Sequence, residues 1–570
     1  MAITLTDEQR KAVEDDLVPQ AIVACAGSGK TTSAVRRVAE IRRRMPQKRG
    51  YVALLSYSNI AVDTFRSEYR ELTKNSPELS DRVVIATVDS FITTNILLPH
   101  GPRSMKCDCR PFLVNGGEAW LNGFKFNNGK YPTSIKDLAV SVADNGFKYT
   151  DVSSYGTPKT VAENTAMPVI ERLGKAGGYT HELARYWAIR SLTEQDRLLE
   201  IMACRYPFIL IDEAQDIGSM HGILVSALLD VGVNVSLIGD PNQAIYEFAD
   251  ADGSFLREFG TASSVSRHSL TENRRSVSQI VSVASALSST TSKAIRKPPA
   301  RKHGAYFISY KQSETGQLVD TFKAILSGHG YAESEAAILC RATALAESIA
   351  GGMSEIGRGA TERLAQAAIW RERGEIAKSF ECVVDGVFRL MESPSATLRR
   401  DIQGSEPSPE VKALRRLLWE FLKRSDIGLP ESALRAKPEW HPRLKSRLPD
   451  LFVMIENTVP MKRSATWKNK LTTADLGEDP LLQRDLLSDT STFIRTRTVH
   501  RVKGEGIDAV LYIARKGDLD KMLAGTGTED GRIGYVAVTR ARDLLVLGIP
   551  ANTSDAVIID LKSKGFSEWI

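Results

Sequence analysis

Residues 26–32 read Ala26-Gly27-Ser28-Gly29-Lys30-Thr31-Thr32, between an apolar run at 21–25 and a helical pattern that extends to about residue 44. A strand, a glycine-rich turn and a helix in this order form a cradle for phosphate, because glycine lets backbone N–H groups wrap the anion and the helix N-terminus favours negative charge. We expect Lys30 to reach the β- and γ-phosphates of a nucleotide and the Thr31 hydroxyl to bind Mg²⁺. Ala24 stands where the usual G-x-x-x-x-G-K-[ST] pattern has its first glycine, but the G-x-G-K-T part is intact.

A second apolar run, at 208–211, ends in the acids Asp212 and Glu213. Carboxylates at the C-terminal end of a parallel strand lie at the same sheet edge as a phosphate loop. We expect Asp212 to bind Mg²⁺, directly or through water, and Glu213 to orient or deprotonate an attacking water molecule. Two such acids alone would as readily form a solvated turn, but together with the loop at Lys30 they indicate nucleotide hydrolysis.

Short apolar runs alternate with longer helical patterns along the chain. The runs lie at 21–25, 51–57, 83–88, 208–212, 235–240, 336–341, 509–514 and 544–549. Continuous apolar strands separated by helices are typical of parallel α/β layers. The runs cluster, and the long gaps between clusters hold Gly/Asn-rich loops and helical stretches. We therefore predict an α/β fold of two cores, each interrupted by a mainly helical insertion.

The gaps give the expected boundaries. The first core comprises residues 1–92 and 191–295, with an insertion at 93–190. The second core comprises 296–345 and 489–570, with a reduced helical insertion at 346–488. We place the linker between the cores near Arg296-Lys297-Pro298-Pro299, because two prolines exclude a helix or a central strand there.

Composition excludes several classes of protein. The chain has 570 residues, 42% of them apolar and 25% charged, which is ordinary for a globular protein and excludes whole-chain disorder. No run approaches the roughly 20 apolar residues of a membrane helix, and the charged N-terminus does not resemble a signal peptide. Six cysteines are too few for a disulfide scaffold, so we expect a reducing, cytoplasmic location and no membrane partner. The net charge of +6 says little about nucleic acid by itself.

With these segments in place, the chain resembles superfamily 1 helicases of the UvrD/Rep/PcrA type, whose fold is two RecA-like P-loop NTPase cores. The resemblance rests first on the phosphate loop and on the segment Asp212-Glu213-Ala214-Gln215-Asp216. Further segments follow in the family's order: 5–9 (Q motif), 56–59 (T-F-T-N), 239–246 (G-D-x-x-Q-x-I-Y), 272–276 (N-Y-R-S), 498–504 (T-x-H-x-x-K-G) and 535–542 (Y-V-x-V-T-R-A). The two insertions match no motif.

The resemblance implies an ATP site in the cleft between the cores. Arg275 and Arg540 would be arginine fingers, and Gln243 would sense the γ-phosphate. The implied nucleotide-binding residues are Gln9, which would read the adenine edge, then Ala26, Gly27, Ser28, Gly29, Lys30, Thr31, Thr32, Arg275, Gly504, Glu505 and Arg540.

Some positions depart from the family. Arg274 and Thr32 stand where the family has an aromatic residue and an arginine that sandwich adenine, so a strict preference for ATP is not implied. Glu505 lies where a ribose contact is expected, and Ile60 replaces a lysine.

The resemblance also implies contacts to single-stranded DNA, in which aromatic side chains stack on bases. The candidates are Tyr57, Asn59, Thr87, Tyr246, Phe248, Thr498 and His500. A basic run after the phosphate loop (Arg36, Arg37, Arg42, Arg43, Arg44, Lys48 and Arg49) is either a solvated helix face or a further nucleic-acid surface.

The sequence thus predicts an ATP- and Mg²⁺-dependent helicase or translocase on single-stranded or tailed duplex DNA, with 3′→5′ polarity implied by the resemblance. The short second insertion and the absence of a long tail after Arg542 also resemble the helicase subunit of Gabija-type anti-phage systems. The alternative is therefore a nucleic-acid-sensing ATPase that controls a partner nuclease. A motor on RNA is a third, less favoured reading.

Overall fold

The computed structural model describes residues 5–45, 50–114, 121, 123–129, 132–143, 146–153, 158–247, 250–288, 290–349, 359–372, 374–392, 398, 402, 408–474, 476–478, 480–481 and 494–569. The chain divides into two compact units. One unit contains both α/β sheets and the first insertion (Met1–Gly116, Leu121–Ala342 and Arg497–Ile570), and the other is built mainly from Thr343–Thr496.

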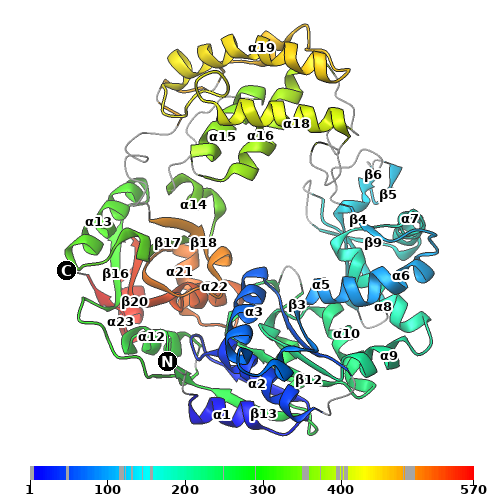
Figure 1. Cartoon of the computed structure of the whole chain (residues 1–570). Coiled ribbons are helices and arrows are strands. Elements are labelled where there is room, and N and C mark those ends of the chain that lie inside the picture. Colours follow the sequence, from blue (N-terminus) through cyan, green and yellow to red (C-terminus); the bar gives the residue numbers. More distant parts are fainter. Residues whose placement is uncertain are drawn as a thin grey trace. The chain divides into compact units, whose positions relative to one another are not determined.

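The first sheet has six strands in the order β13-β1-β12-β11-β2-β3, and every pairing in it is parallel (Figure 1). Its strands are β1 (Gln20–Ala24), β2 (Val52–Ser56), β3 (Val83–Thr87), β11 (Phe208–Ile211), β12 (Asn234–Gly239) and β13 (Ser266–Leu270). The helices of this core are α1 (Asp7–Glu14), α2 (Lys30–Arg44), α3 (Asn59–Thr73), α4 (Pro77–Ser80), α5 (Val88–Ile92), α10 (Ser219–Asp230) and α11 (Ser254–Phe259). Because the strands are parallel, the loops after β1, β11 and β12 all emerge at one edge of the sheet.

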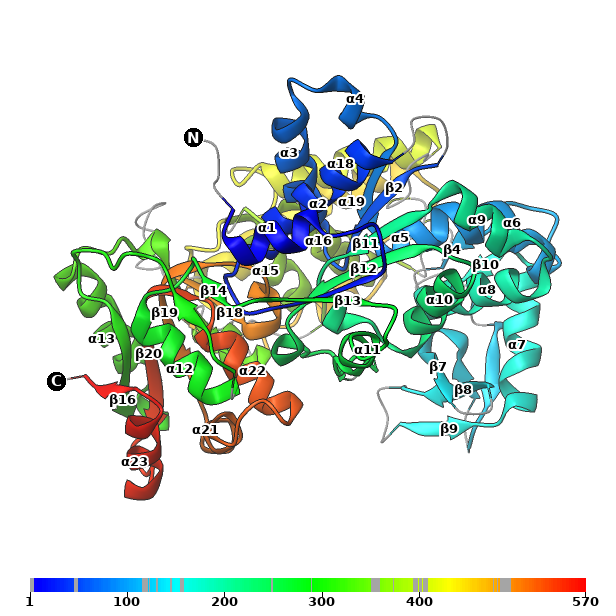
Figure 2. The same cartoon turned by 90° about the horizontal axis from the view of Figure 1, so that it is seen from below.

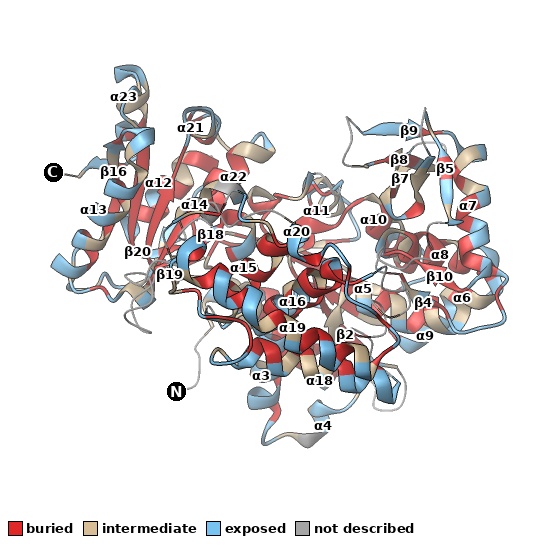
Figure 3. Cartoon of the chain, turned by 90° about the horizontal axis from the view of Figure 1, so that it is seen from above, coloured by how far each residue is buried: buried red, intermediate tan, exposed pale blue. Residues whose placement is uncertain are grey.

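The second sheet has the order β18-β17-β19-β20-β16-β21. Its strands are β16 (Gly304–Tyr310), β17 (Ala336–Cys340), β18 (Arg495–Thr498), β19 (Ile507–Ile513), β20 (Ala541–Pro550) and β21 (Ser567–Glu568). Its helices are α12 (Ser278–Ser288), α13 (Thr315–Gly328), α21 (Lys516–Leu523), α22 (Glu529–Val538) and α23 (Asp555–Ser563). The central strands β19 and β20 are buried along most of their length (Figure 3).

The passage between the two sheets lies earlier in the chain than the prolines suggest. Ile280, Val283 and Leu287 of α12 belong to the hydrophobic cluster of the second sheet, together with Phe307 and Leu545. The short strands β14 (Glu272–Asn273) and β15 (Lys293–Ala294) pair on either side of this helix. Pro298 and Pro299 therefore precede β16 within the second core, and the chain changes cores near residues 274–277.

The first insertion contains helices and, in addition, small antiparallel sheets that the sequence patterns do not reveal. Its helices are α6 (Leu98–Met105), α7 (Glu163–Lys175), α8 (His181–Glu194) and α9 (Leu198–Arg205). Strands β7 (Leu138–Ala143), β8 (Gly146–Asp151) and β9 (Lys159–Val161) lie side by side (Figure 2), and β5 (Lys125–Asn127) pairs with β6 (Pro132–Ser134). The strands β4 (Phe112–Leu113) and β10 (Gly178–Tyr179) form a third pair. Most of these strands are only two or three residues long, so they lack the continuous apolar runs that predict strands in the cores.

The second unit is helical in its described part and has a hydrophobic core of its own. Its helices are α14 (Thr343–Ile349), α15 (Gly359–Glu372), α16 (Ile376–Leu390), α18 (Pro409–Lys423), α19 (His441–Thr458) and α20 (Trp467–Lys470). Leu414, Leu418 and Leu422 line the buried stripe of α18 expected from its apolar spacing, while α18 and α19 each expose their opposite side (Figure 3). Among the described residues, no helix combines the length and the apolar character needed to cross a bilayer.

Candidate nucleotide and nucleic-acid site

The phosphate loop connects β1 to α2 and needs both of its glycines. Gly27 and Gly29 have φ angles of 72° and 81°, in the left-handed region that other residues rarely adopt. A Cβ on Gly27 would lie 2.5 Å from Cβ of Arg275, and one on Gly29 would lie 2.5 Å from Nε2 of Gln9. The loop is therefore too tightly enclosed for any larger residue at these two positions.

The carbonyl groups at the back of this loop accept hydrogen bonds from three other residues. Asn273 Nδ2 donates to the Ala26 carbonyl (2.7 Å), the Arg274 N–H donates to the Gly27 carbonyl (2.9 Å), and Gln9 Nε2 donates to the Ser28 carbonyl (2.8 Å). These carbonyls are bonded behind the loop. The N–H groups of the loop and the N-terminus of α2 therefore lie on the face that can receive a phosphate. Lys30 and Thr31 are the first two residues of that helix, and Thr32 hydrogen-bonds to Glu68.

Asp212 follows β11 and is 2% exposed. Its N–H donates to the Leu55 carbonyl (2.8 Å), but its Oδ1 has no hydrogen-bond partner among the described residues. Burial and the neighbouring Glu213 raise the pKa of this carboxyl. A buried carboxylate oxygen without a partner, beside the Thr31 end of α2, fits a divalent cation such as Mg²⁺, which prefers oxygen ligands.

Glu213 is held in the left-handed region (φ 54°) and hydrogen-bonds to the amide of Gln215. Burial alone would raise the pKa of Glu213, but the nearby cations Lys30 and Lys503 lower it to about 2. This carboxylate therefore carries its charge at neutral pH and can accept a hydrogen bond from water.

A hydrogen-bonded chain joins the two cores beside these acids. The Gln243 amide donates to Asp240 (2.7 Å) and its Oε1 accepts from Nη2 of Arg540 (2.9 Å). Asp240 in turn accepts from the Tyr535 hydroxyl (3.3 Å). Gln243 thus links the edge of the first sheet to the helix end that carries Arg540.

Arg275 and Arg540 are brought together between the two sheets. Arg275 donates to the carbonyls of Thr539 (3.2 Å) and Gly504 (3.3 Å), and Arg540 donates to the Glu505 carbonyl (3.1 Å). Burial and the charge of Arg275 lower the pKa of Arg540 to about 9. A buried guanidinium group (Arg540) and a half-buried one (Arg275) that repel each other form a site suited to a multiply charged anion.

The nucleic-acid candidates fall into two groups. Tyr246 and His500 come from different cores, and their ring centroids are 5.9 Å apart; Thr498 lies two residues before His500, at the end of β18. The Lys503 ammonium lies 4.7 Å from the centre of the Tyr246 ring and bonds both oxygens of Asp216 (2.6 and 2.7 Å).

The second group belongs to the first core. The Tyr57 ring lies edge-on to His221, with centroids 5.4 Å apart, and its hydroxyl has no hydrogen-bond partner in the part of the chain that the structure describes. Asn59 begins α3 and is exposed, and Thr87 caps α5 through the Ser90 N–H (3.2 Å). Phe248 lies outside the described residues.

Comparisons with known proteins agree with this geometry. The family described as UvrD/REP helicase N-terminal domain matches residues 5–125 and 167–263. ATP-dependent DNA helicase UvrD2 of Mycobacterium tuberculosis is 23% identical over 62% of this chain and 54% of its own length. DNA helicase II of Salmonella typhimurium is 24% identical over 50% of this chain and 40% of its own length. The YjcD protein of Bacillus subtilis is 23% identical over 97% of this chain and 79% of its own length.

Together these matches support a UvrD-like helicase of superfamily 1. The chain spans about half the length of the first curated relatives that it matches.

Several residues of this candidate site are not singled out by the sequence. Asn273 supports the phosphate loop, Asp216 pairs with Lys503, and Arg532 joins Glu247 and the Ala244 carbonyl. All but Arg532 and Glu247 lie inside the segments that resemble the family. Their partners lie hundreds of residues away, so no local pattern could reveal the contacts.

Four arginines of the basic run after the phosphate loop make contacts within the fold. Arg37 is 1% exposed and donates to the carbonyls of Val13, Asp15 and Asp16 at the end of α1. Arg42 pairs with Asp81, while Arg43 and Arg44 pair with Glu40. Lys48 and Arg49 lie outside the described residues.

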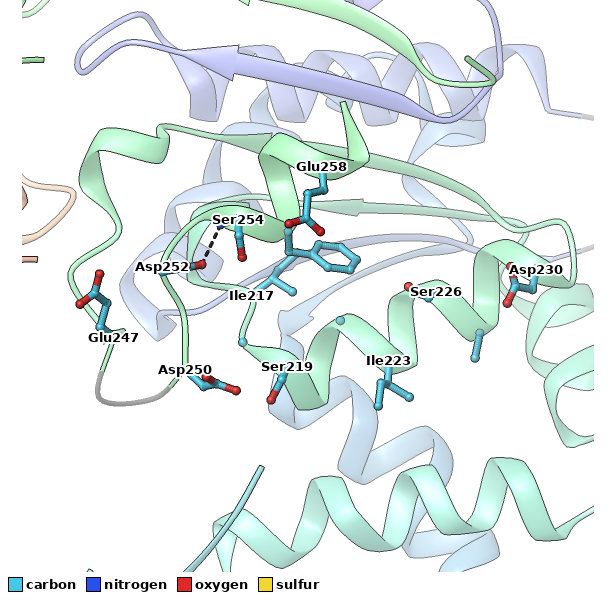
Figure 4. Close-up of a pocket in the computed structure, with 14 residues that line it drawn as sticks. Ile217, Ser219, Ile223, Ser226, Asp230, Glu247, Asp250, Asp252, Ser254 and Glu258 are labelled. Carbon is cyan, nitrogen blue, oxygen red and sulfur yellow. Dashed lines mark hydrogen bonds between the residues drawn. The ribbon is translucent and has the colours of Figure 1, made fainter. Parts of the chain in front are cut away.

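A pocket of about 790 Å³ lies next to α10 and is distinct from the nucleotide site (Figure 4). Its lining includes five acids, Asp230, Glu247, Asp250, Asp252 and Glu258, and no residue of the phosphate loop. This concentration of negative charge repels a triphosphate, so the phosphate loop remains the candidate nucleotide site.

Proposed function

We propose that this chain is an ATP-dependent DNA helicase or translocase that acts on single-stranded or tailed duplex DNA. The observation that carries the proposal is the hydrogen bond between Gln243 and Arg540, beside Glu213 and Arg275. It joins the phosphate-loop core to an arginine of the second core, so that a nucleotide bound there contacts both cores. Relatives named ATP-dependent DNA helicase support the same activity.

In the proposed hydrolysis of ATP, each residue of the site has a separate role. Lys30 and the loop N–H groups bind the triphosphate, and Thr31 and Asp212 hold Mg²⁺, which supplies positive charge against the phosphate oxygens when bound. Glu213 accepts a proton from water as the water oxygen bonds to the γ-phosphorus and the bond to the bridging oxygen of ADP breaks. Arg275 and Arg540 stabilise the charge on the transferred phosphoryl group, an effect worth roughly 10³–10⁵ in rate.

The same segments offer a path from hydrolysis to DNA. Gln243 and Tyr246 belong to one short stretch, so a change at the γ-phosphate moves the hydrogen-bonding and the stacking residue together. Tyr246 contacts His500 of the second core, and Tyr57 and Asn59 provide contacts on the first. Opening and closing of the cores would then alternate the grip on stacked bases and move the strand.

The finer features are part of the proposal. Polarity is 3′→5′ and the location is cytoplasmic, as the family resemblance and the cysteine content imply. The alternative, an ATPase that controls a partner nuclease in anti-phage defence, rests on the short second insertion alone.

ATP turnover with and without single-stranded DNA tests the proposal. We expect DNA to stimulate turnover, and Lys30→Ala to reduce it by at least about 100-fold. Lys311→Ala is the matched control, because Lys311 is 69% exposed and pairs with Glu314 on the second core. Turnover that ignores DNA, or that survives Lys30→Ala, would contradict the proposed function.

A further inference from the structure

Arg275 lies in the segment where the chain crosses from the first core to the second, and the fold holds its backbone on both sides. Its N–H donates to Oδ1 of Asn273 (2.8 Å), and its carbonyl accepts from Nη1 of Arg296 (2.7 Å). The two bonds hold the peptide planes that flank Arg275, so both of its soft backbone dihedrals are restrained. The direction in which its side chain leaves the backbone is thereby set.

The pairing of β14 with β15 brings Arg296 to this carbonyl. Asn273 lies opposite Ala294 in the parallel register, and the Ile295 N–H donates to the Asn273 carbonyl (2.9 Å). Arg296 is the next residue, so it lies alongside Arg275 although 21 residues separate the two in the sequence.

Arg296 is held in turn by Asp543, a buried acid of β20 in the second sheet. Asp543 is 1% exposed; its Oδ1 lies 2.8 Å from Nη1 of Arg296, and its Oδ2 accepts from Nη2 of Arg301 (3.1 Å). Burial of a carboxylate is unfavourable unless it is paired, so this acid favours an arginine beside it. Because β20 begins directly after Arg540, the same strand supports both arginines of the candidate site.

We infer that Arg296 is a positioning residue for Arg275. Its hydrogen bond to the Arg275 carbonyl, supported by Asp543, aims the Arg275 guanidinium at the transferred phosphoryl group. The inference rests on the proposed hydrolysis of ATP. A displacement of about 1 Å at a reacting centre can lower a rate on the order of 100-fold, so loss of Arg296 should act on the rate of hydrolysis more than on the affinity for nucleotide.

Arg296→Met tests this, because methionine keeps an unbranched side chain and removes the donor. Arg301→Met is the matched control, since each of the two variants leaves Asp543 with one arginine. Arg301 bonds Glu335 (3.0 Å) where Arg296 bonds the Arg275 carbonyl. Arg296→Lys is the second variant, since an ammonium retains a donor and the positive charge beside Asp543.

The measurements are kcat and KM for ATP, and the single-turnover rate in chains that also carry Arg275→Ala. We expect Arg296→Met to lower kcat by about tenfold and to change KM by less than about twofold. Arg296→Lys should restore most of the rate, and Arg301→Met should have a rate close to that of the wild type. In the Arg275→Ala background, Arg296→Met should lower the rate no further, because the group that it positions is gone.

Equal losses of kcat in Arg296→Met and Arg301→Met would overturn the inference, as would a wild-type kcat in Arg296→Met. The inference also fails if the loss caused by Arg296→Met recurs in full in the Arg275→Ala background. A wild-type rate in Arg275→Ala alone would instead refute the proposed role of Arg275 in hydrolysis, on which the inference depends.

Discussion

Arg275 and Arg540 place two positive charges together beside Glu213, with Arg540 fully buried. In the described part of the chain their hydrogen bonds go to backbone carbonyls, to Gln243 and to the Thr539 hydroxyl, and none goes to a carboxylate. This arrangement distinguishes them from ordinary surface arginines, which pair with acids. It is the strongest single-residue sign that an anion with several charges binds here.

Arg540→Ala should lower kcat for ATP by about 10³-fold or more, because the guanidinium acts on charge that develops in the transition state. The affinity for nucleotide should change far less, and a fluorescent ATP analogue measures it. Arg542→Ala is the control, since Arg542 lies two residues further on, is 46% exposed and bonds Asp508. Equal losses in the two variants would contradict the assigned role of Arg540.

Asp212 should lower the stability of the nucleotide-free chain, although turnover requires it. Its buried Oδ1 has no partner among the described residues, and Glu213 lies beside it. Asp212→Asn should therefore raise the melting temperature of the nucleotide-free chain by a few degrees, since about 1 kcal/mol shifts it by roughly 2–4 °C. The same variant should abolish Mg²⁺-dependent turnover. A lower melting temperature in the presence of a chelator would show that this carboxylate stabilises the fold.

At the scale of helices and strands, α1 and α2 form a rigid support behind the phosphate loop. Arg37 of α2 binds three carbonyls at the end of α1, although its place in a basic run resembles a nucleic-acid surface. The sequence cannot separate these readings, because burial of one arginine depends on a helix that lies more than twenty residues away.

Arg37→Ala should lower the free energy of unfolding by about 3 kcal/mol, because three carbonyls, one of them on the buried Val13, lose their donor and a buried side chain is removed. Arg43→Ala should change it by less than about 0.5 kcal/mol, since its pair with Glu40 is exposed. Denaturant unfolding measures both, and neither variant should alter the affinity for single-stranded DNA. Weaker DNA binding by Arg37→Ala with unchanged stability would restore the nucleic-acid interpretation.

The elements themselves were predictable where the sequence is continuously apolar. All eight apolar runs form strands of the two sheets, from β1 and β2 to β19 and β20. The edge strand β13 was not predicted, because four of its five residues are polar. The strands of the first insertion were not predicted either, because most of them are only two or three residues long. At the site, the phosphate loop and both acids follow from local order, whereas the role of Asn273 depends on contacts that only the fold creates.

At the scale of the whole unit that contains both sheets, contacts between the cores gather around one segment. Arg532 of α22 is 4% exposed, bonds the Ala244 carbonyl and pairs with Glu247. Thr526 donates to Asn242 (2.7 Å) in the same region. Helix α22, which ends two residues before Arg540, is thereby attached to the stretch that carries Gln243 and Tyr246.

Arg532→Ala should therefore reduce the stimulation of ATP turnover by DNA more than it reduces basal turnover. Lys521→Ala is the control, because Lys521 lies on the same core, is 53% exposed and pairs with Asp530. Steady-state rates with and without single-stranded DNA give the ratio. If Arg532→Ala leaves the ratio of the two rates unchanged, these contacts do not couple DNA binding to ATP turnover.

Displacement of streptavidin from biotinylated single-stranded DNA tests most directly whether hydrolysis drives movement. A motor with 3′→5′ polarity moves toward the 5′ end, so we predict ATP-dependent displacement from a 5′-biotin and little from a 3′-biotin. Lys30→Ala should displace from neither end. Turnover stimulated by DNA without displacement from either end would contradict the account and would favour an ATPase that senses nucleic acid without moving along it.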